Sequence, residues 1–234
     1  MKKNFKLILS ILILNSQIFA LAGLGVYGDF DLLKYPSGTS GDINGAGVSY
    51  DGFDNAYGTG LMLYVDAIPF VDLQFDVEFV GNIYKYTPYL VGAPLSTEEL
   101  PWGRVSTYTT IRKNILGLSI PFLAKAQWYG GLGFNNHKVV PIMTSEVIED
   151  ALDSVDLETA LDTFNSNSED AAKDLAKGML NNVEKISGLH LQTGVRAKLL
   201  MFNVFANARY TLAKDVIPDK SGYPSIWIGL AVGI

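Results

Sequence analysis

Carboxylates recur along one face of the segment 70–84. Asp72, Asp76 and Glu78 are separated by even numbers of residues. Even spacing places these side chains on one side of a β-strand, and no helix could collect them there. Asp29 and Asp66 occupy comparable positions in two earlier segments. Such a face could be a solvated acidic stripe, a carboxylate site or one side of an ion-pair network.

A second set of polar side chains carries the opposite charge. Lys125, Arg196, Lys198 and Arg209 come from segments in the second half of the chain, and His190 lies among them. If the polar faces form an interior, an acidic wall faces a basic wall. We interpret this as a network of ion pairs and hydrogen bonds that fills a narrow space, because the interior enclosed by the eight strands predicted below has room for little beyond side chains. A gated pore or a path for a small ligand is the alternative.

Other candidate sites are weaker. Residues 23–28 match the G-x-G-x-x-G pattern, but no strand precedes them and no helix follows. The acids of the first long loop, around Asp51, lack EF-hand spacing and are more typical of turns than of a calcium site. The chain has no cysteine and only two histidines, His137 and His190, neither near an obvious Ser–acid pair. We therefore expect no enzyme, no cofactor and no metal site.

The elements that position these residues are predicted to be β-strands. The segment 70–84 alternates apolar and polar residues for its last fourteen positions. At about 3.3 Å per residue it is long enough to cross a bilayer when tilted. Seven other stretches fit the same template, and the eight predicted strands are 23–33, 57–67, 70–84, 104–120, 124–134, 189–199, 202–211 and 225–234.

The segment 104–120 fits the template least well. Leu116, Leu118 and Ile120 define an apolar face. Continuing the same alternation toward the N-terminus places Asn114 and Arg112 on this apolar face. A charge at the bilayer midplane costs about 2–4 kcal/mol. We therefore predict either a β-bulge near Lys113 and Asn114 or an arginine that reaches the interface.

The connections alternate between short and long. Three short apolar turns end at Phe70, Phe122 and Phe202, whereas long polar loops join the opposite ends of the predicted strands. Apolar turns are unusual in water and suit a membrane interface. Tyrosines near the long loops suggest a second aromatic girdle, formed by Tyr84, Tyr86, Tyr108, Tyr210 and Tyr223.

The first 22 residues have the features of a secretory signal peptide: three lysines, an apolar run at 7–14 and the small-residue site Ala20-Leu21-Ala22. We expect residues 23–234 to form one domain. Without the signal, fifteen Lys and Arg face twenty-four Asp and Glu, a net charge of −9. A chain without a basic patch is unsuited to nucleic acid. No later segment has eighteen consecutive apolar residues, so any membrane span must be a strand.

In this architecture the chain resembles the small eight-stranded outer-membrane β-barrels of Gram-negative bacteria, of the OmpA, OmpX and OmpW type. The resemblance implies an all-β fold, an antiparallel up-and-down transmembrane β-barrel in the outer membrane. It also implies two partners, outer-membrane lipid and the outer-membrane assembly machinery. Such barrels usually end in Phe or Trp, whereas this chain ends in Ile234.

The third long loop, 139–188, is predicted to be a helical insertion between the fifth and sixth strands. Ser145 is a candidate N-cap, and Ser168 begins a second amphipathic pattern that continues through Met179 to Ile186. Eleven acids and three lysines give the insertion a charge of −8. We expect a structural or surface-interaction role, with an extracellular partner at this acidic loop. The alternatives are a passive channel gated by the loop, and a soluble lipocalin-type barrel with its apolar faces inside.

Overall fold

The computed structural model describes residues 22–42, 45–66, 70–91, 93–120, 123–151, 177–179 and 181–233. The predicted signal peptide therefore lies almost wholly outside the described residues. Within them, no helix has the length and apolar character needed to cross a membrane.

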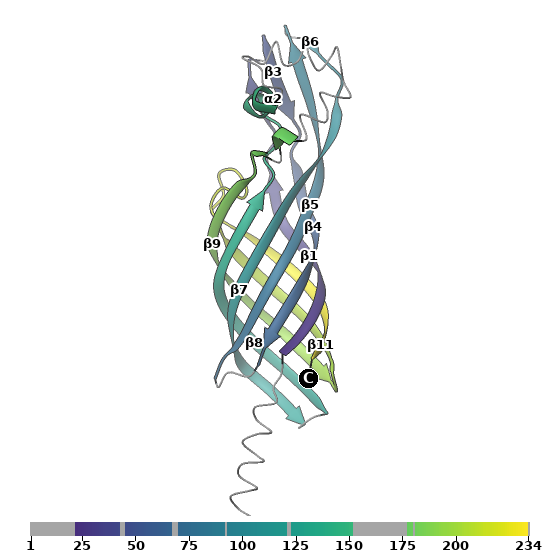
Figure 1. Ribbon diagram of the computed structural model, residues 1–234, viewed down its shortest axis with the longest axis vertical. Coiled ribbons are helices and arrows are strands. Elements are labelled where there is room, and N and C mark those ends of the chain that lie inside the picture. Colours follow the sequence, from purple (N-terminus) through teal and green to yellow (C-terminus); the bar gives the residue numbers. More distant parts are fainter. Residues whose placement is uncertain are drawn as a thin grey trace, which may run out of the picture.

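Eight strands of the described chain close into an antiparallel ring in sequence order (Figure 1). β1 pairs with both β4 and β11, and the pair Gly23–Gly233 lies at the closing edge. The fold is therefore the predicted up-and-down barrel. Its strands are β1 (Ala22–Tyr35), β4 (Phe53–Val65), β5 (Asp72–Leu90), β7 (Glu98–Ile120), β8 (Ala124–Val139), β9 (Glu184–Leu199), β10 (Phe202–Leu212) and β11 (Tyr223–Gly233).

The two faces of the barrel wall differ in chemistry as the alternation predicts. Along β5, Phe75, Val77 and Phe79 point outward and are 39–52% exposed, whereas Asp76 and Glu78 point inward and are buried. β11 shows the same alternation, with Ile228 and Leu230 outside and Trp227 inside. Apolar side chains on the outer face contradict the lipocalin-type alternative, which placed them in the interior.

A β-bulge in β7 resolves the position of Arg112. The register with β8 shifts between Asn114 and Leu116, which leaves Ile115 as the extra residue. Below the bulge Leu116 and Leu118 point outward, and above it Ile111 does so, while Arg112 turns inward and is 1% exposed. Of the two predicted alternatives, the bulge is confirmed, one or two residues later than expected. An arginine that reaches the interface is not needed.

The predicted tyrosine girdle is largely wrong. Only Tyr210 faces outward, at 42% exposure, whereas Tyr84, Tyr86, Tyr108 and Tyr223 are buried inside the barrel or beneath its loops. Parity decides this outcome, because each of the four occupies a position of its strand that faces inward. Among the short turns, the Leu200–Met201 connection between β9 and β10 is tight and exposed, as predicted. Residues 67–69 and 121–122 of the other two lie outside the described ranges.

The long-loop end carries a small extension of the sheet (Figure 1). β2 (Gly38–Gly41) and β3 (Ala46–Tyr50) form a hairpin, β3 pairs with the outer part of β5, and β6 (Ala93–Pro94) pairs with the end of β5. The first two long segments, predicted as polar loops, therefore contain paired strands.

The insertion is only partly described. α2 (Ser145–Ala151) lies where a helix was expected, but its N-cap is Thr144 and not the predicted Ser145, because the Thr144 hydroxyl accepts a hydrogen bond from the Val147 backbone N–H at 3.4 Å. Ser40 of β2 accepts a hydrogen bond from the Ser145 backbone N–H at 3.1 Å. The predicted helix from Ser168 lies mostly outside the described residues. Its extension to Ile186 is wrong, because β9 begins at Glu184 and Ile186 pairs with His137. Long-range strand pairing overrides the helical spacing there.

Candidate functional site: the filled interior of the barrel

A chain of polar contacts crosses the lower half of the interior, the part nearer the short turns. Asp66, at the end of β4, accepts a short ion-pair contact from Arg196 and another from Arg112 at 3.4 Å. Arg112 also donates to the Gln74 side-chain oxygen at 3.1 Å, and Gln74 donates to both oxygens of Asp76 at 2.8 Å. These contacts join four strands across the interior.

The same chain continues upward from Asp76. Arg209 donates to Asp76 at 2.8 Å and to Glu78 at 3.2 Å. Arg104 then bridges Glu78 at 2.9 Å and Asp31 at 2.7 Å. All five side chains are at most 1% exposed in these pairs. Buried charges require such pairing, because desolvation would otherwise cost several kcal/mol per ion.

Aromatic rings fill the space between these charges. The guanidinium carbon of Arg209 lies 3.8 Å from the centre of the Tyr108 ring, and that of Arg196 lies 4.3 Å from the Tyr64 ring. Tyr27, Tyr64, Phe205 and Trp227 belong to one buried cluster. Stacking of this kind stabilises desolvated guanidinium groups and leaves little free volume.

Both histidines face the interior. His137 lies in β8, which continues beyond the predicted end of this strand at residue 134. Its Nδ1 is 2.8 Å from the Ser106 hydroxyl and its Nε2 is 3.0 Å from Asn135 Oδ1. His190 Nε2 is 2.8 Å from the Thr110 hydroxyl. The Ser106–His137 pair has the spacing of a nucleophile and a base, but Ser106 is completely buried. We assign it a structural role, because a substrate has no access to it.

The structure brings together most, but not all, of the predicted site residues. Asp66, Asp76, Glu78, Arg196 and Arg209 are joined in ion pairs. Lys125 lies 3.9 Å from Asp66 at the lower rim. Asp72 and Lys198 are half-buried near the same rim, and Asp29 is buried at 5% exposure with no hydrogen-bond partner for either carboxylate oxygen.

The sequence interpretation missed two of the arginines that hold the network together. Arg104 and Arg112 belong to β7, next to the acidic β5, so the picture of opposite acidic and basic walls is incomplete. The predicted bulge was the signal that could have revealed both arginines, because a bulge reverses the facing of the residues above it. Above it, Arg104, Ser106, Tyr108, Thr110 and Arg112 alternate with outward residues in the normal way.

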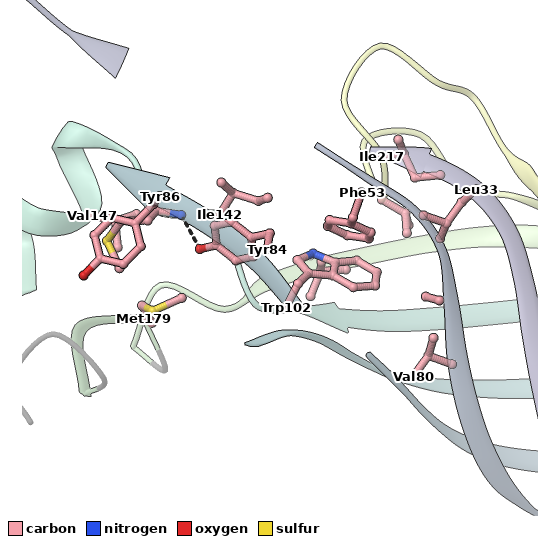
Figure 2. Packing of buried hydrophobic residues seen from close by; sticks show 14 of the residues in the cluster. Leu33, Phe53, Val80, Tyr84, Tyr86, Trp102, Ile142, Val147, Met179 and Ile217 are labelled. Atoms are coloured by element: carbon pink, nitrogen blue, oxygen red, sulfur yellow. Dashed lines mark hydrogen bonds between the residues drawn. The ribbon is translucent and has the colours of Figure 1, made fainter. Parts of the chain in front are cut away.

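An apolar cap covers the network at the long-loop end (Figure 2). Trp102 lies at its centre, with ring centroids 5.2 Å from Phe53 and 6.1 Å from Tyr35. The insertion contributes directly, since the Met143 backbone N–H donates to the Tyr84 hydroxyl at 2.9 Å. We use the name cap for this cluster, which also contains Leu33, Val48, Val80, Tyr86, Ile142, Val147, Ile148, Val216, Ile217 and Tyr223.

The fold is that of an eight-stranded antiparallel barrel with an apolar outer face and a polar interior. Solved structures with a similar fold include OprG from Pseudomonas aeruginosa (TM-score 0.49, 10% identity, covering 92% of this chain and 95% of that one). Another is Neisserial surface protein A (TM-score 0.43, 12% identity, covering 91% of this chain and 96% of that one). A third is Ail of Yersinia pestis in complex with the heparin analogue sucrose octasulfate (TM-score 0.39, 9% identity, covering 92% of this chain and 98% of that one). No protein-family model and no curated protein matches the sequence.

A cleft of about 500 Å³ lies beside the cap, between α2, the ends of β8 and β9, and the loop before β11. Tyr35, Tyr50 and Val216 contribute to its apolar lining. Its rim carries four exposed carboxylates, and no lysine or arginine is among the described residues that line it; the four are Glu146, Asp150, Glu184 and Asp215.

Local hydrogen bonds fix the charge at this rim. The pKa of Glu146 is lowered, chiefly because its carboxylate accepts a hydrogen bond from its own backbone N–H and also from the Thr144 hydroxyl. Burial raises the pKa of Tyr86, beneath α2, to about 12, so this tyrosine stays neutral. The cleft is therefore negatively charged at neutral pH.

Proposed function

We propose that this protein is an outer-membrane β-barrel of a Gram-negative bacterium whose interior is closed, and whose role is to hold and display the structure at its long-loop end. The observation that carries the proposal is the unbroken chain of contacts from Asp66 to Asp31 across the interior. The apolar outer face fits the lipid phase, because contiguous exposed apolar surface of this extent marks a membrane or protein contact.

The filled interior argues against the alternative of a passive channel. An ion that followed the barrel axis would have to displace paired arginines and carboxylates and then separate the cap. Each buried pair is costly to break, by about 3–5 kcal/mol when one partner is removed. A non-enzymatic role is proposed for the same reason, since the polar groups are engaged with one another.

Single-channel recording in planar bilayers tests the closed interior. We expect no conductance steps from the complete protein. A variant in which residues 140–183 are replaced by a short Gly-Ser linker should also be silent, because the ion pairs lie below the cap. Steady conductance of the complete protein would contradict the proposal, and conductance only after the replacement would make the insertion a gate.

The outer cleft supports a surface-interaction role with a positively charged partner. The four rim carboxylates and the apolar lining suit a basic chain with apolar side chains. Three of the four carboxylates, Glu146, Asp150 and Glu184, belong to the insertion, whose net charge over residues 139–188 is −8. The remaining partners proposed for the protein are outer-membrane lipid and the assembly machinery.

Binding of an oligolysine probe to the reconstituted protein tests this role. The variant Glu146→Gln, Asp150→Asn, Asp215→Asn should bind roughly tenfold more weakly at low salt, since exposed ion pairs contribute about 0.2–1 kcal/mol each. The matched control removes three exposed acids outside the cleft lining, with Asp51→Asn, Asp54→Asn and Glu98→Gln. Equal weakening in both variants would mean that the cleft does not select the probe.

A further inference from the structure

Three buried carboxylates converge beneath the cap. Asp29 and Asp31 of β1 and Glu78 of β5 each offer one oxygen, and these oxygens all lie within 4.8 Å of one another. All three side chains are nine-tenths or more buried, at 5%, 0% and 0% exposure. They lie directly below Leu33 and Val80, the next inward-facing cap residues on the same strands.

The protein's own donors leave part of this cluster unsatisfied. Arg104 contacts Asp31 Oδ2 and Glu78 Oε1, and Tyr27 and Arg209 contact Glu78 Oε2. Both oxygens of Asp29 and Oδ1 of Asp31 receive no hydrogen bond from any donor group of the protein, and the Asp29 and Asp31 carboxyls lie within hydrogen-bond reach of each other. A buried carboxylate without a donor is costly, so Asp29 requires either a proton shared with Asp31 or a bound cation.

The charges of the upper interior do not balance either. Four carboxylates, Asp29, Asp31, Asp76 and Glu78, lie with two guanidinium groups, Arg104 and Arg209. Nearby His137 and His190 contact hydroxyl and amide groups rather than carboxylates. If all four carboxylates are ionised and both histidines are neutral, this part of the interior carries two negative charges in excess.

We infer that Asp29, Asp31 and Glu78 bind one divalent cation of the hard, oxygen-preferring class, with Ca²⁺ as the best fit. Ca²⁺ takes carboxylate oxygens at about 2.3–2.6 Å, so ligand atoms on opposite sides of one ion are up to about 5 Å apart. The oxygen spacing here satisfies that limit. The set contains no nitrogen or sulfur ligand, which disfavours zinc and copper.

The cation would complete the architecture of the interior. It would neutralise the two excess charges and occupy the free oxygens of Asp29 and Asp31 while leaving the Arg104 bridge in place. The expectation of no metal site rested on the spacing of the loop acids and on the scarcity of Cys and His, since the sequence alone does not place Asp29 beside Glu78. The competing explanation is a proton shared between Asp29 and Asp31.

Terbium luminescence distinguishes the two explanations. Tb³⁺ substitutes for Ca²⁺ and is excited by a tyrosine at close range; Tyr27 OH lies 3.2 Å and Tyr108 OH 3.4 Å from the Glu78 carboxylate. Tyr35 and Tyr50 line the outer cleft together with acids of the insertion, so emission from Tb³⁺ bound there is separated from emission of the buried site by the variants below. The full protein is refolded in detergent with Tb³⁺ present, and we expect sensitised emission that Ca²⁺ displaces.

The variants Asp29→Asn and Asp31→Asn should lose this emission, whereas Asp72→Asn, a half-buried acid at the lower rim, should retain it. As a second readout, Ca²⁺ should raise the temperature of the folded-to-unfolded gel shift for the native protein and the Asp72 variant, relative to chelator. Asp29→Asn should be insensitive to Ca²⁺ but should still fold, because it removes an unpartnered charge. Wild-type emission no greater than that of Asp29→Asn, with no effect of Ca²⁺ on the gel shift, would overturn the proposal and assign the pair to a shared proton.

Discussion

Replacing Arg209 with methionine is expected to lower the free energy of unfolding by about 3–5 kcal/mol, because it leaves the buried Asp76 without its ion-pair partner and removes one of the two arginines that contact Glu78. Arg209 is fully buried and contacts Asp76 at 2.8 Å and Glu78 at 3.2 Å. It also stacks on Tyr108 at 3.8 Å. Methionine retains part of the packing but none of the charge, so the variant isolates the electrostatic contribution.

Urea unfolding of the protein reconstituted in lipid vesicles measures this effect. The control Lys214→Met removes an exposed positive charge just after β10 and should change stability by less than about 0.5 kcal/mol. A shift of comparable size in the control would show that net charge, rather than the buried pair, governs stability.

A double variant makes the test sharper. Adding Asp76→Leu to Arg209→Met replaces the ion pair by apolar groups, and such replacements are often neutral. We expect the double variant to recover most of the lost stability, since Glu78 keeps Arg104 and Tyr27 as partners. If the two losses simply add, the two side chains do not interact energetically and the network interpretation fails.

Replacing Trp102 with alanine is expected to cost about 3–5 kcal/mol, the usual range for a large aromatic side chain removed from a core. Trp102 is 1% exposed and contacts Phe53 and Tyr35 at the centre of the cap (Figure 2). Its loss leaves a cavity between the first loop, the start of β4 and the outer part of β7. The cap should then hold the insertion less firmly.

Limited proteolysis is the second measurement for Trp102→Ala. Residues 140–151 should be cleaved faster than in the native protein, because Ile142, Met143, Val147 and Ile148 pack in the same cluster. Trp128→Ala is the matched control: Trp128 is 48% exposed on the outer face and donates to Thr193 at 2.9 Å. An equal cleavage rate in the two variants would indicate that Trp102 does not fasten the insertion.

The alternation of residue types by itself determined the barrel wall. The period of two in β5 assigned Asp76 and Glu78 to one face and Phe75, Val77 and Phe79 to the other, and the structure keeps that assignment. The parity conflict at Arg112 left a bulge or an interfacial arginine as alternatives, and the structure has the bulge. Both outcomes follow because a strand side chain has only two directions, and a one-residue slip reverses all of them.

The identity of each partner across the interior depended on the tertiary structure. Arg104 reaches Asp31 and Glu78 only because the ring closes with β1, β5 and β7 at matching levels. Four tyrosines near the long loops became interior and cap residues instead of a girdle, since an aromatic type suits either environment. Residue type alone does not distinguish a tyrosine of an interfacial girdle from a tyrosine of the interior.

The sequence thus determined which residues face inward, and the tertiary structure decided which of them meet. The acids on or next to β1, β4 and β5 were visible as a set, but only the closed barrel separates Asp66, held by Arg112 and Arg196, from Asp29, which no arginine or lysine contacts within ion-pair distance among the described residues. The physical reason is that direction is a local property of the strand, whereas contact depends on register, shear and closure of the whole ring.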